Sequence, residues 1–187
     1  MTDTELIKSA GGGDRAAFES LYFRHWKAVY SYAWLLTRSV ADAEDITQEC
    51  FLTLIRKAEL FDPAGAQLRT WLIAVVRRQY FGRRRNSSRE TGGVDLQQVP
   101  SAAEFDEDLI RAERAGTVRL AMAALPQAQQ EALYLFEFEG LSLSEVAGVL
   151  NIEANAVKAR LYRAREQLKL LLAPLREGAS PAGGNYD

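Results

Sequence analysis

The chain has 187 residues, with 23 Lys and Arg against 25 Asp and Glu and a formal net charge of −2. At ~150 residues per domain this length indicates one domain or two small ones, and the composition, 48% hydrophobic and 26% charged, is typical of a folded protein and excludes a disordered one. A single Cys (Cys50) and a single His (His25) exclude an internal disulfide and a four-ligand zinc site.

The chain begins Met-Thr-Asp-Thr-Glu and lacks the basic start and apolar run of a signal peptide. Its longest fully apolar run, Trp71 to Val76, is far shorter than the ~18 residues that span a membrane. We therefore expect a soluble, cytoplasmic protein with no membrane insertion.

Apolar residues recur at helical spacing, and no segment shows the sustained alternation of a strand. The first predicted helix follows a turn and cap at 11–14, and its apolar face consists of Phe18, Leu21, Tyr22, Val29 and Leu36. The apolar face of the second consists of Ala43, Ile46, Cys50 and Leu54, flanked by Ile55. Pro63 and Gly65 break the pattern before a third helix that begins near Leu68.

The second helix also has a polar face. Asp45, Gln48, Glu49 and Leu52 share this face at helical spacing, away from Ile46 and Cys50. The strip is acidic with one exposed apolar residue, which suits a docking surface. Taken alone, most strips of this kind are simply solvated.

Charged residues then form blocks of one sign, which the net charge conceals. Seven basic and no acidic residues lie between 69 and 89, and six acidic and no basic residues lie between 90 and 108. The acidic stretch contains Gly92, Gly93 and Pro100, so it is interpreted as a flexible linker. The predicted organisation is all-α: a helical domain at 1–86, the linker at 87–108, a second helical domain at 109–175 and a flexible tail at 176–187.

Aromatic residues interleave with the arginines of the basic block, as Phe61, Trp71, Tyr80 and Phe81. Stacking rings and positive charges together suit single-stranded DNA. Two plainer interpretations stay open. Trp71 can be a core residue, and the arginines at 83–85 can be a solvated helix end.

A helix-turn-helix is predicted after Gly140. Ser142 and Glu145 form a capping box that opens a short helix with one apolar face. Ala147, Asn151 and Val157 then have the spacing of the small residue, the turn residue and the β-branched plug of this motif. The next helix is basic: six basic residues and one acid lie between 155 and 176. Such a face suits base edges and phosphates, although an amphipathic bundle helix would also be basic outside.

Three segments together resemble the bacterial sigma-70 family, in its small two-domain extracytoplasmic-function (ECF) group. Asp42 to Phe51 resembles the helix of region 2 that docks on the clamp helices of the RNA polymerase β′ subunit. Residues 61–85, with Arg-Thr-Trp-Leu at 69–72, resemble the segment that melts and reads the −10 element. Leu125 to Leu168 resembles region 4, which reads the −35 element through its helix-turn-helix.

The resemblance implies a role for each matching position. Core polymerase binding is expected of Asp45, Gln48, Glu49, Phe51 and Leu52. Binding to −10 DNA is expected of Phe61, Asp62, Gln67, Arg69, Trp71, Arg77, Arg78, Arg83 and Arg84, with the loop at 62–67 as a pocket for a flipped base. Binding to −35 DNA is expected of Asn155, Lys158, Arg160, Tyr162, Arg163 and Arg165.

The resemblance also implies partners. These are core RNA polymerase, through the β′ clamp helices and the β flap, promoter DNA and an anti-sigma factor, with a monomer outside such complexes. No catalytic residue, cofactor or metal is expected. Arg78 departs from the Asn that many relatives carry, which puts the −10 preference in doubt. The rival hypotheses are a free-standing helix-turn-helix regulator and a helical adaptor that binds only protein.

Overall fold

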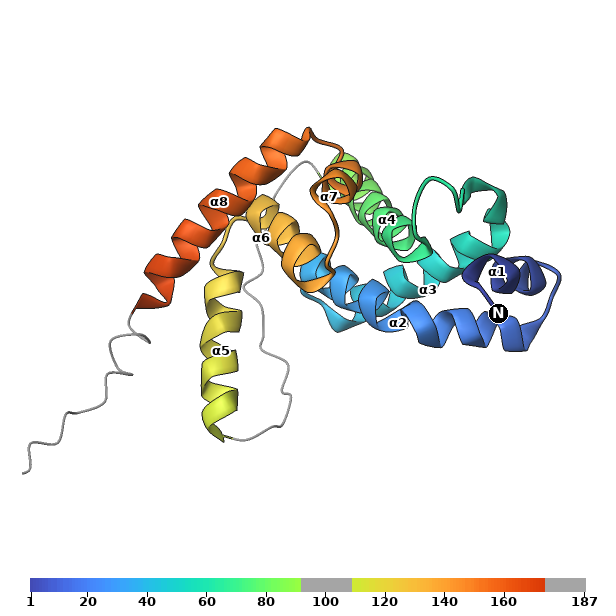
Figure 1. Ribbon diagram of the computed structural model, residues 1–187, viewed down its shortest axis with the longest axis horizontal. Coiled ribbons are helices and arrows are strands. Elements are labelled where there is room, and N and C mark those ends of the chain that lie inside the picture. The colour runs from blue at the N-terminus through green and yellow to red at the C-terminus, as the bar shows by residue number, and fades with distance from the viewer. Residues whose placement is uncertain (92–108, 174–187) are drawn as a thin grey trace, which may run out of the picture.

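The computed structural model describes residues 1–91 and 109–173, with side chains at 1–86 and 116–173. Every regular element in these ranges is helical, which confirms the predicted all-α fold (Figure 1). The α-helices are α1 (Asp3–Gly11), α2 (Arg15–Thr37), α3 (Val40–Arg56), α4 (Leu68–Thr91), α5 (Leu109–Ala123), α6 (Gln127–Leu133), α7 (Leu143–Leu150) and α8 (Ala154–Leu171). A short 3₁₀ turn, Ala58–Leu60, follows α3, and a π-helical segment, Tyr134–Phe138, continues α6.

Local capping explains where the first helices begin. Thr2 and Glu5 form a capping box at the start of α1, a helix that the apolar pattern alone did not predict. Gly13 adopts φ 95°, and Asp14 then caps α2 by accepting hydrogen bonds from the amides of Ala16 and Ala17. The predicted turn and cap at 11–14 is therefore confirmed.

Helices α1 to α4 pack around one core. The fully buried side chains of this half include Leu21, Val29, Ile46, Leu54, Leu72 and Val76. Cys50 belongs to the same core, where its thiol donates to the Leu72 carbonyl (3.5 Å) and burial raises its pKa. Helix α4 continues to Thr91, because no Pro or Gly pair interrupts it before Gly92. The first residues of the predicted linker are thus helical, and its remainder, with the predicted tail beyond Ala173, lies outside the described residues.

The second half has the local geometry predicted for a helix-turn-helix. Ser142 and Glu145 form the capping box of α7, and Asn151 ends that helix in the left-handed conformation at φ 53°. The Ile152 amide donates to the Ala147 carbonyl (3.1 Å), which closes the turn. Val157 of α8 is fully buried, and α8 packs against α7. Each element of the motif that the spacing predicted is confirmed.

The two halves pack against each other. Helix α7 contacts α4, and α6 contacts α2 (Figure 1). Buried apolar residues of both halves, such as Val76 and Leu135, belong to one continuous cluster. Among the described residues, no helix has both the length and the apolarity needed to cross a membrane. The arginine-rich helix α4 belongs to the N-terminal bundle and also contacts α7 of the helix-turn-helix.

Candidate nucleic-acid interface

The acidic strip on α3 lies on its outer face. Asp45 and Gln48 are exposed, and Glu49 and Leu52 are half-buried. Phe51, in contrast, is 1% exposed, and its ring packs on Tyr22 with centroids 4.9 Å apart. The strip available to a partner therefore consists of Asp45, Gln48, Glu49 and Leu52, while Phe51 supports it from the core.

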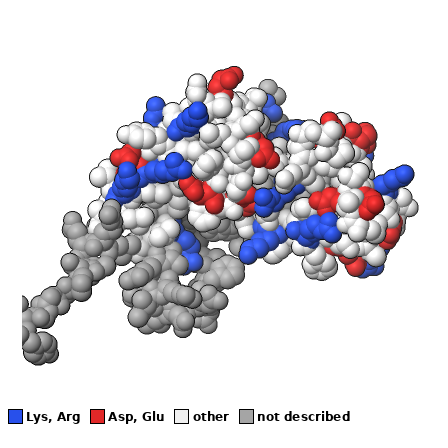
Figure 2. Space-filling model, viewed as in Figure 1, with Lys and Arg blue, Asp and Glu red and all other residues white. Residues whose placement is uncertain are grey.

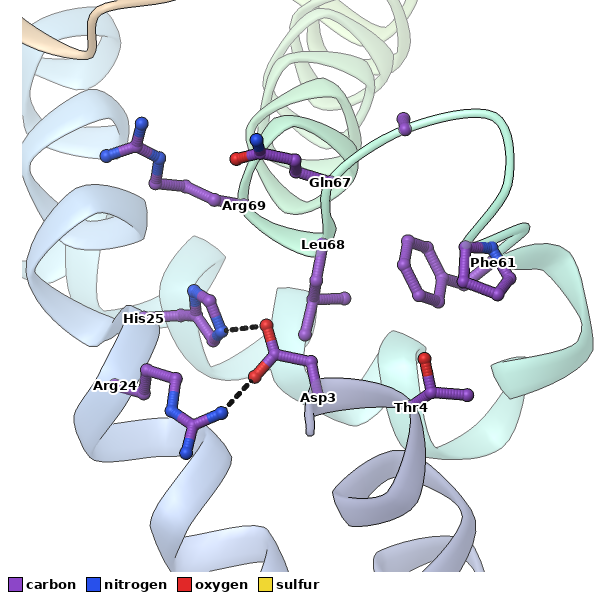
Figure 3. Close-up of a pocket in the computed structure, with 10 residues that line it drawn as sticks. Asp3, Thr4, Arg24, His25, Phe61, Gln67, Leu68 and Arg69 are labelled. Atoms are coloured by element: carbon purple, nitrogen blue, oxygen red, sulfur yellow. Dashed lines mark hydrogen bonds and ion pairs between the residues drawn. The ribbon is translucent and has the colours of Figure 1, made fainter. Parts of the chain in front are cut away.

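A cavity of about 470 Å³ lies between α1, α2 and the segment that leads into α4 (Figure 3). Among the residues that line it, Phe61, Gln67 and Arg69 are three that the sequence assigned to −10 DNA. Asp62, which is exposed, shapes the loop beside it, since its carboxylate accepts from the Ala64 amide (2.9 Å). The cavity is open to solvent at one end of the bundle and has both aromatic and hydrogen-bonding walls.

Helix α1 contributes Asp3 and Thr4 to this cavity. The Asp3 carboxylate accepts from Arg24, and its other oxygen lies 2.9 Å from His25 Nε2 (Figure 3). Burial lowers the pKa of His25, and the Asp3 charge opposes this effect. The sequence reasoning missed Asp3 and Thr4, although the capping box of Thr2 and Glu5 would have indicated a helix here.

Trp71 lies next to the cavity without being one of its lining residues. It is half-buried, packs against the core, and meets the Phe61 ring edge-on with centroids 5.9 Å apart. This environment fits the interpretation of Trp71 as a packing residue that holds Phe61 in place.

The arginines of α4 fall into two groups. Arg78 and Arg83 are exposed, and Arg84 donates to the Tyr80 hydroxyl (3.0 Å). Arg69 and Arg77 instead contact the second half of the chain. Arg69 donates to the Glu139 carbonyl (2.7 Å), and Arg77 Nε donates to the Glu131 carboxylate (2.9 Å).

Glu131 is the central residue of this contact. Its side chain is 4% exposed, and the same carboxylate oxygen accepts from Arg77 and from the Tyr32 hydroxyl (3.3 Å). Burial and the Glu131 charge raise the pKa of Tyr32. The sequence does not indicate Glu131 as a functional residue. Neighbouring residues in this Gln-rich helix carry no signal that Glu131 pairs with an arginine 54 positions earlier.

The outer face of α8 presents the residues predicted to read DNA. Asn155, Lys158, Tyr162 and Arg163 are exposed, as is Arg165, which pairs with Glu137 (2.6 Å). Arg160 is half-buried beside them. Figure 2 shows Lys and Arg side chains along this helix, at the left of the view. The arrangement provides an exposed, mostly basic helix face that follows a helix-turn-helix.

Two family models match this chain. One, described as Sigma-70 region 2, matches residues 21–90. The other, described as Sigma-70, region 4, matches residues 116–168. The first covers the strip on α3, the loop at 61–67 and most of α4, and the second covers the helix-turn-helix with the α8 face.

Named proteins are similar over nearly the whole chain. The chain is 30% identical to the ECF RNA polymerase sigma factor SigM of Mycobacterium tuberculosis, over 96% of this chain and 89% of that protein. It is 32% identical to the ECF RNA polymerase sigma factor SigE of Mycolicibacterium smegmatis, over 86% of this chain and 65% of that protein.

Solved structures share the fold. One is the sigma factor RpoE in complex with the anti-sigma factor NepR from Bartonella quintana, with a TM-score of 0.68 and 24% identity over 83% of this chain and 96% of that one. Another is CnrH in complex with the cytosolic domain of CnrY, with a TM-score of 0.63 and 25% identity over 95% of this chain and 99% of that one.

Proposed function

This chain belongs to the sigma-70 family as an ECF RNA polymerase sigma factor, and from that premise we propose that it directs core polymerase to promoters by contacting both the −10 and the −35 elements. The proposal rests on the order in which three surfaces follow one another along the chain. An acidic strip, an arginine-rich helix with an adjoining cavity, and a basic helix-turn-helix follow one another along the chain. Sigma factors are initiation factors and not enzymes, so we assign no catalytic residue.

Residues 1–86 form the region 2 domain in this proposal, with the strip on α3 as the polymerase contact. The exposed carboxylate of Asp45 and the half-buried Glu49 suit a basic partner surface such as the β′ clamp helices. Leu52 adds an apolar contact beside them. Phe51 keeps an indirect role, because its ring packs against Tyr22 and Phe18 beneath the strip.

The cavity beside Phe61 is the proposed pocket for an unpaired base of the −10 element. An aromatic ring offers a stacking surface, and the Gln67 amide and the Arg69 guanidinium offer hydrogen bonds to a base edge. The exposed Arg78 and Arg83 on the following helix suit the phosphates of the same strand. Asp3 contributes a carboxylate to the wall, which suits an exocyclic amino group.

Residues 109–175 form the region 4 domain in this proposal, with α8 as its −35-reading helix. Lys158, Tyr162 and Arg163 lie exposed on α8, and a recognition helix contacts base edges through such a face. Arg160 and Arg165 lie beside this face and suit phosphates or polymerase. Tethering both domains to polymerase raises their effective concentration at the promoter, so neither needs high affinity alone.

Control by an anti-sigma factor is part of the proposed function. RpoE and CnrH were each solved with an anti-sigma factor or the cytosolic domain of a second protein bound. A free-standing helix-turn-helix regulator is not favoured, because the similarity to ECF factors extends over the region 2 half as well as over the helix-turn-helix.

Two substitutions separate the proposed roles. Glu49→Lys reverses a charge on the polymerase-facing strip and should lower the amount of core polymerase retained in a pull-down.

Arg163→Ala removes a −35 contact and should reduce −35-dependent transcription while polymerase retention stays at the wild-type level.

The matched controls are Glu19→Lys, an exposed charge reversal on α2, and Lys169→Ala, near the far end of α8. Each should resemble the wild type in both assays. Unchanged retention with Glu49→Lys would contradict the placement of the polymerase contact, and an equal loss of both activities with Arg163→Ala would contradict the placement of the −35 contact.

A further inference from the structure

Helix α1 places a carboxylate in the wall of the cavity beside Phe61. Asp3 is the first residue of α1, directly after the Thr2 that caps the helix. The residues that bury the apolar side of α1 in the bundle are Leu6, Ile7 and Ala10. Asp3 therefore lines the cavity from a helix end that its cap and its packing hold in place.

Two side chains of α2 orient the Asp3 carboxylate. One carboxylate oxygen accepts from the Arg24 guanidinium, and the other lies 2.9 Å from His25 Nε2 (Figure 3). The Asp3 side chain is 27% exposed, whereas that of His25 is 9% exposed. A carboxylate has about four lone-pair sites, so each oxygen keeps an acceptor position after these two contacts. The group is thus fixed in orientation and still able to accept a hydrogen bond.

The ion pair with Arg24 also makes an acid compatible with DNA at this position. A lone carboxylate would repel the phosphates on either side of a base that entered the cavity. Arg24 offsets the charge of Asp3, and Arg69 lines the same cavity with a further positive charge. The wall of α1 therefore presents oxygen acceptors without an excess of negative charge.

An acceptor at this wall distinguishes between bases. Cytosine, adenine and guanine carry an exocyclic amino group that donates, whereas thymine carries only carbonyl oxygens outside its ring nitrogens. A carbonyl oxygen placed against the Asp3 carboxylate meets a second acceptor and stays unpaired, which weakens binding by about tenfold. The Thr4 hydroxyl and the Gln67 amide both donate and accept, and Arg69 donates to acceptors that every base has. The discrimination therefore falls on Asp3.

We propose that Asp3 is a specificity-determining residue: its carboxylate, oriented by Arg24 and His25, selects an unpaired base that carries an exocyclic amino group and disfavours thymine. This inference rests on the proposed function of the cavity as the pocket for an unpaired −10 base. Arg24 and His25 act through Asp3 and are positioning residues. If Asp3 only tied α1 to α2, its substitution would change the affinity for all bases alike.

The test measures how polymerase reconstituted with the full-length chain binds two labelled single-stranded homopolymers, one of thymine and one of 5-methylcytosine. These bases share the ring and the methyl group, and they differ in one exocyclic group, carbonyl or amino, and in the proton on the ring nitrogen beside it. In a homopolymer every register places the same base in the cavity. The ratio of the two affinities, measured by fluorescence anisotropy, is therefore the base preference.

The wild type should prefer the 5-methylcytosine strand by about tenfold. Asp3→Asn replaces one acceptor oxygen by an amide that donates to a carbonyl, so the preference should disappear or reverse in favour of thymine. The control Glu19→Gln removes a carboxylate charge from the exposed side of α2 and should keep the wild-type preference. Arg24→Gln changes an exposed residue and should reduce the preference in part, which keeps the test valid if the Asp3 variant fails to fold.

A further variant separates this inference from the proposed function. Phe61→Ala removes the stacking ring and should weaken the binding of both homopolymers by similar factors. If Phe61→Ala has this effect while Asp3→Asn keeps the full preference, or if the wild type shows no preference, Asp3 does not select the base and the proposed pocket still stands. If Phe61→Ala leaves both affinities unchanged, no base enters the cavity, and the inference and the proposed pocket fail together.

Discussion

At the scale of single residues, His25 shows how burial and a charged neighbour compete. Its side chain is 8% exposed in the floor of the cavity, and Asp3 lies within hydrogen-bond distance. Burial lowers the pKa of the imidazole more than the carboxylate raises it. Between the lowered folded value and the ordinary value of 6.5 the unfolded chain binds the extra proton, so the free energy of unfolding falls as the pH drops through this window.

We expect a titration of His25 by proton NMR to give a pKa below 6.5. The chain has 1 His, so its ring resonance needs no further assignment. Asp3→Asn removes the charge that raises the pKa and should lower the value further, whereas Glu19→Gln on the exposed face of α2 should leave it unchanged. A wild-type value above 6.5, or a rise with Asp3→Asn, would contradict the burial argument.

At the scale of elements, the sequence predicts best the features that depend on residues close together in the chain. Helix periodicity, the capping box of Ser142 and Glu145, and the left-handed turn at Asn151 all depend on neighbouring residues, and each is found in the structure. The apolar pattern does not predict α1, because its buried apolar residues are few (Leu6, Ile7 and Ala10) and its clearest signal is the capping box of Thr2 and Glu5. The first residues of the predicted linker belong to α4, because a change in charge does not stop a helix.

The turn between α7 and α8 offers a test at this scale. Asn151 has φ 53°, a conformation that glycine adopts freely and that a Cβ disfavours by about 1–2 kcal/mol. Asn151→Ala should therefore lower the free energy of unfolding by about 1 kcal/mol in urea denaturation. Asn151→Gly should equal or exceed the wild type. Equal stability of the Ala and Gly variants would contradict the left-handed assignment.

At the scale of the whole molecule, the arrangement of the two halves could not be predicted from the sequence. The blocks of charge indicate which surfaces suit DNA, and the exposed Lys158, Tyr162 and Arg163 on α8 fit that expectation. The pairing of Arg77 with Glu131 joins residues 54 positions apart, on helices that spacing does not relate. Within the same basic run, therefore, one group of arginines is exposed and another is bound by region 4.

Two of the opposite-charge pairs within the net charge of −2 join the two halves of the molecule. Acids of the second half lie against arginines of the first, so the charges that cancel in the sum also meet in space.

We infer that this chain gives core RNA polymerase a promoter specificity. The most direct measurement is in vitro transcription with purified bacterial core polymerase on a library of genomic fragments, with and without the chain, followed by sequencing of the transcripts. We expect new start sites that share one −10 and one −35 sequence, which Glu49→Lys weakens at all promoters together. If the chain adds no promoter-specific transcript, it does not direct core polymerase to promoters.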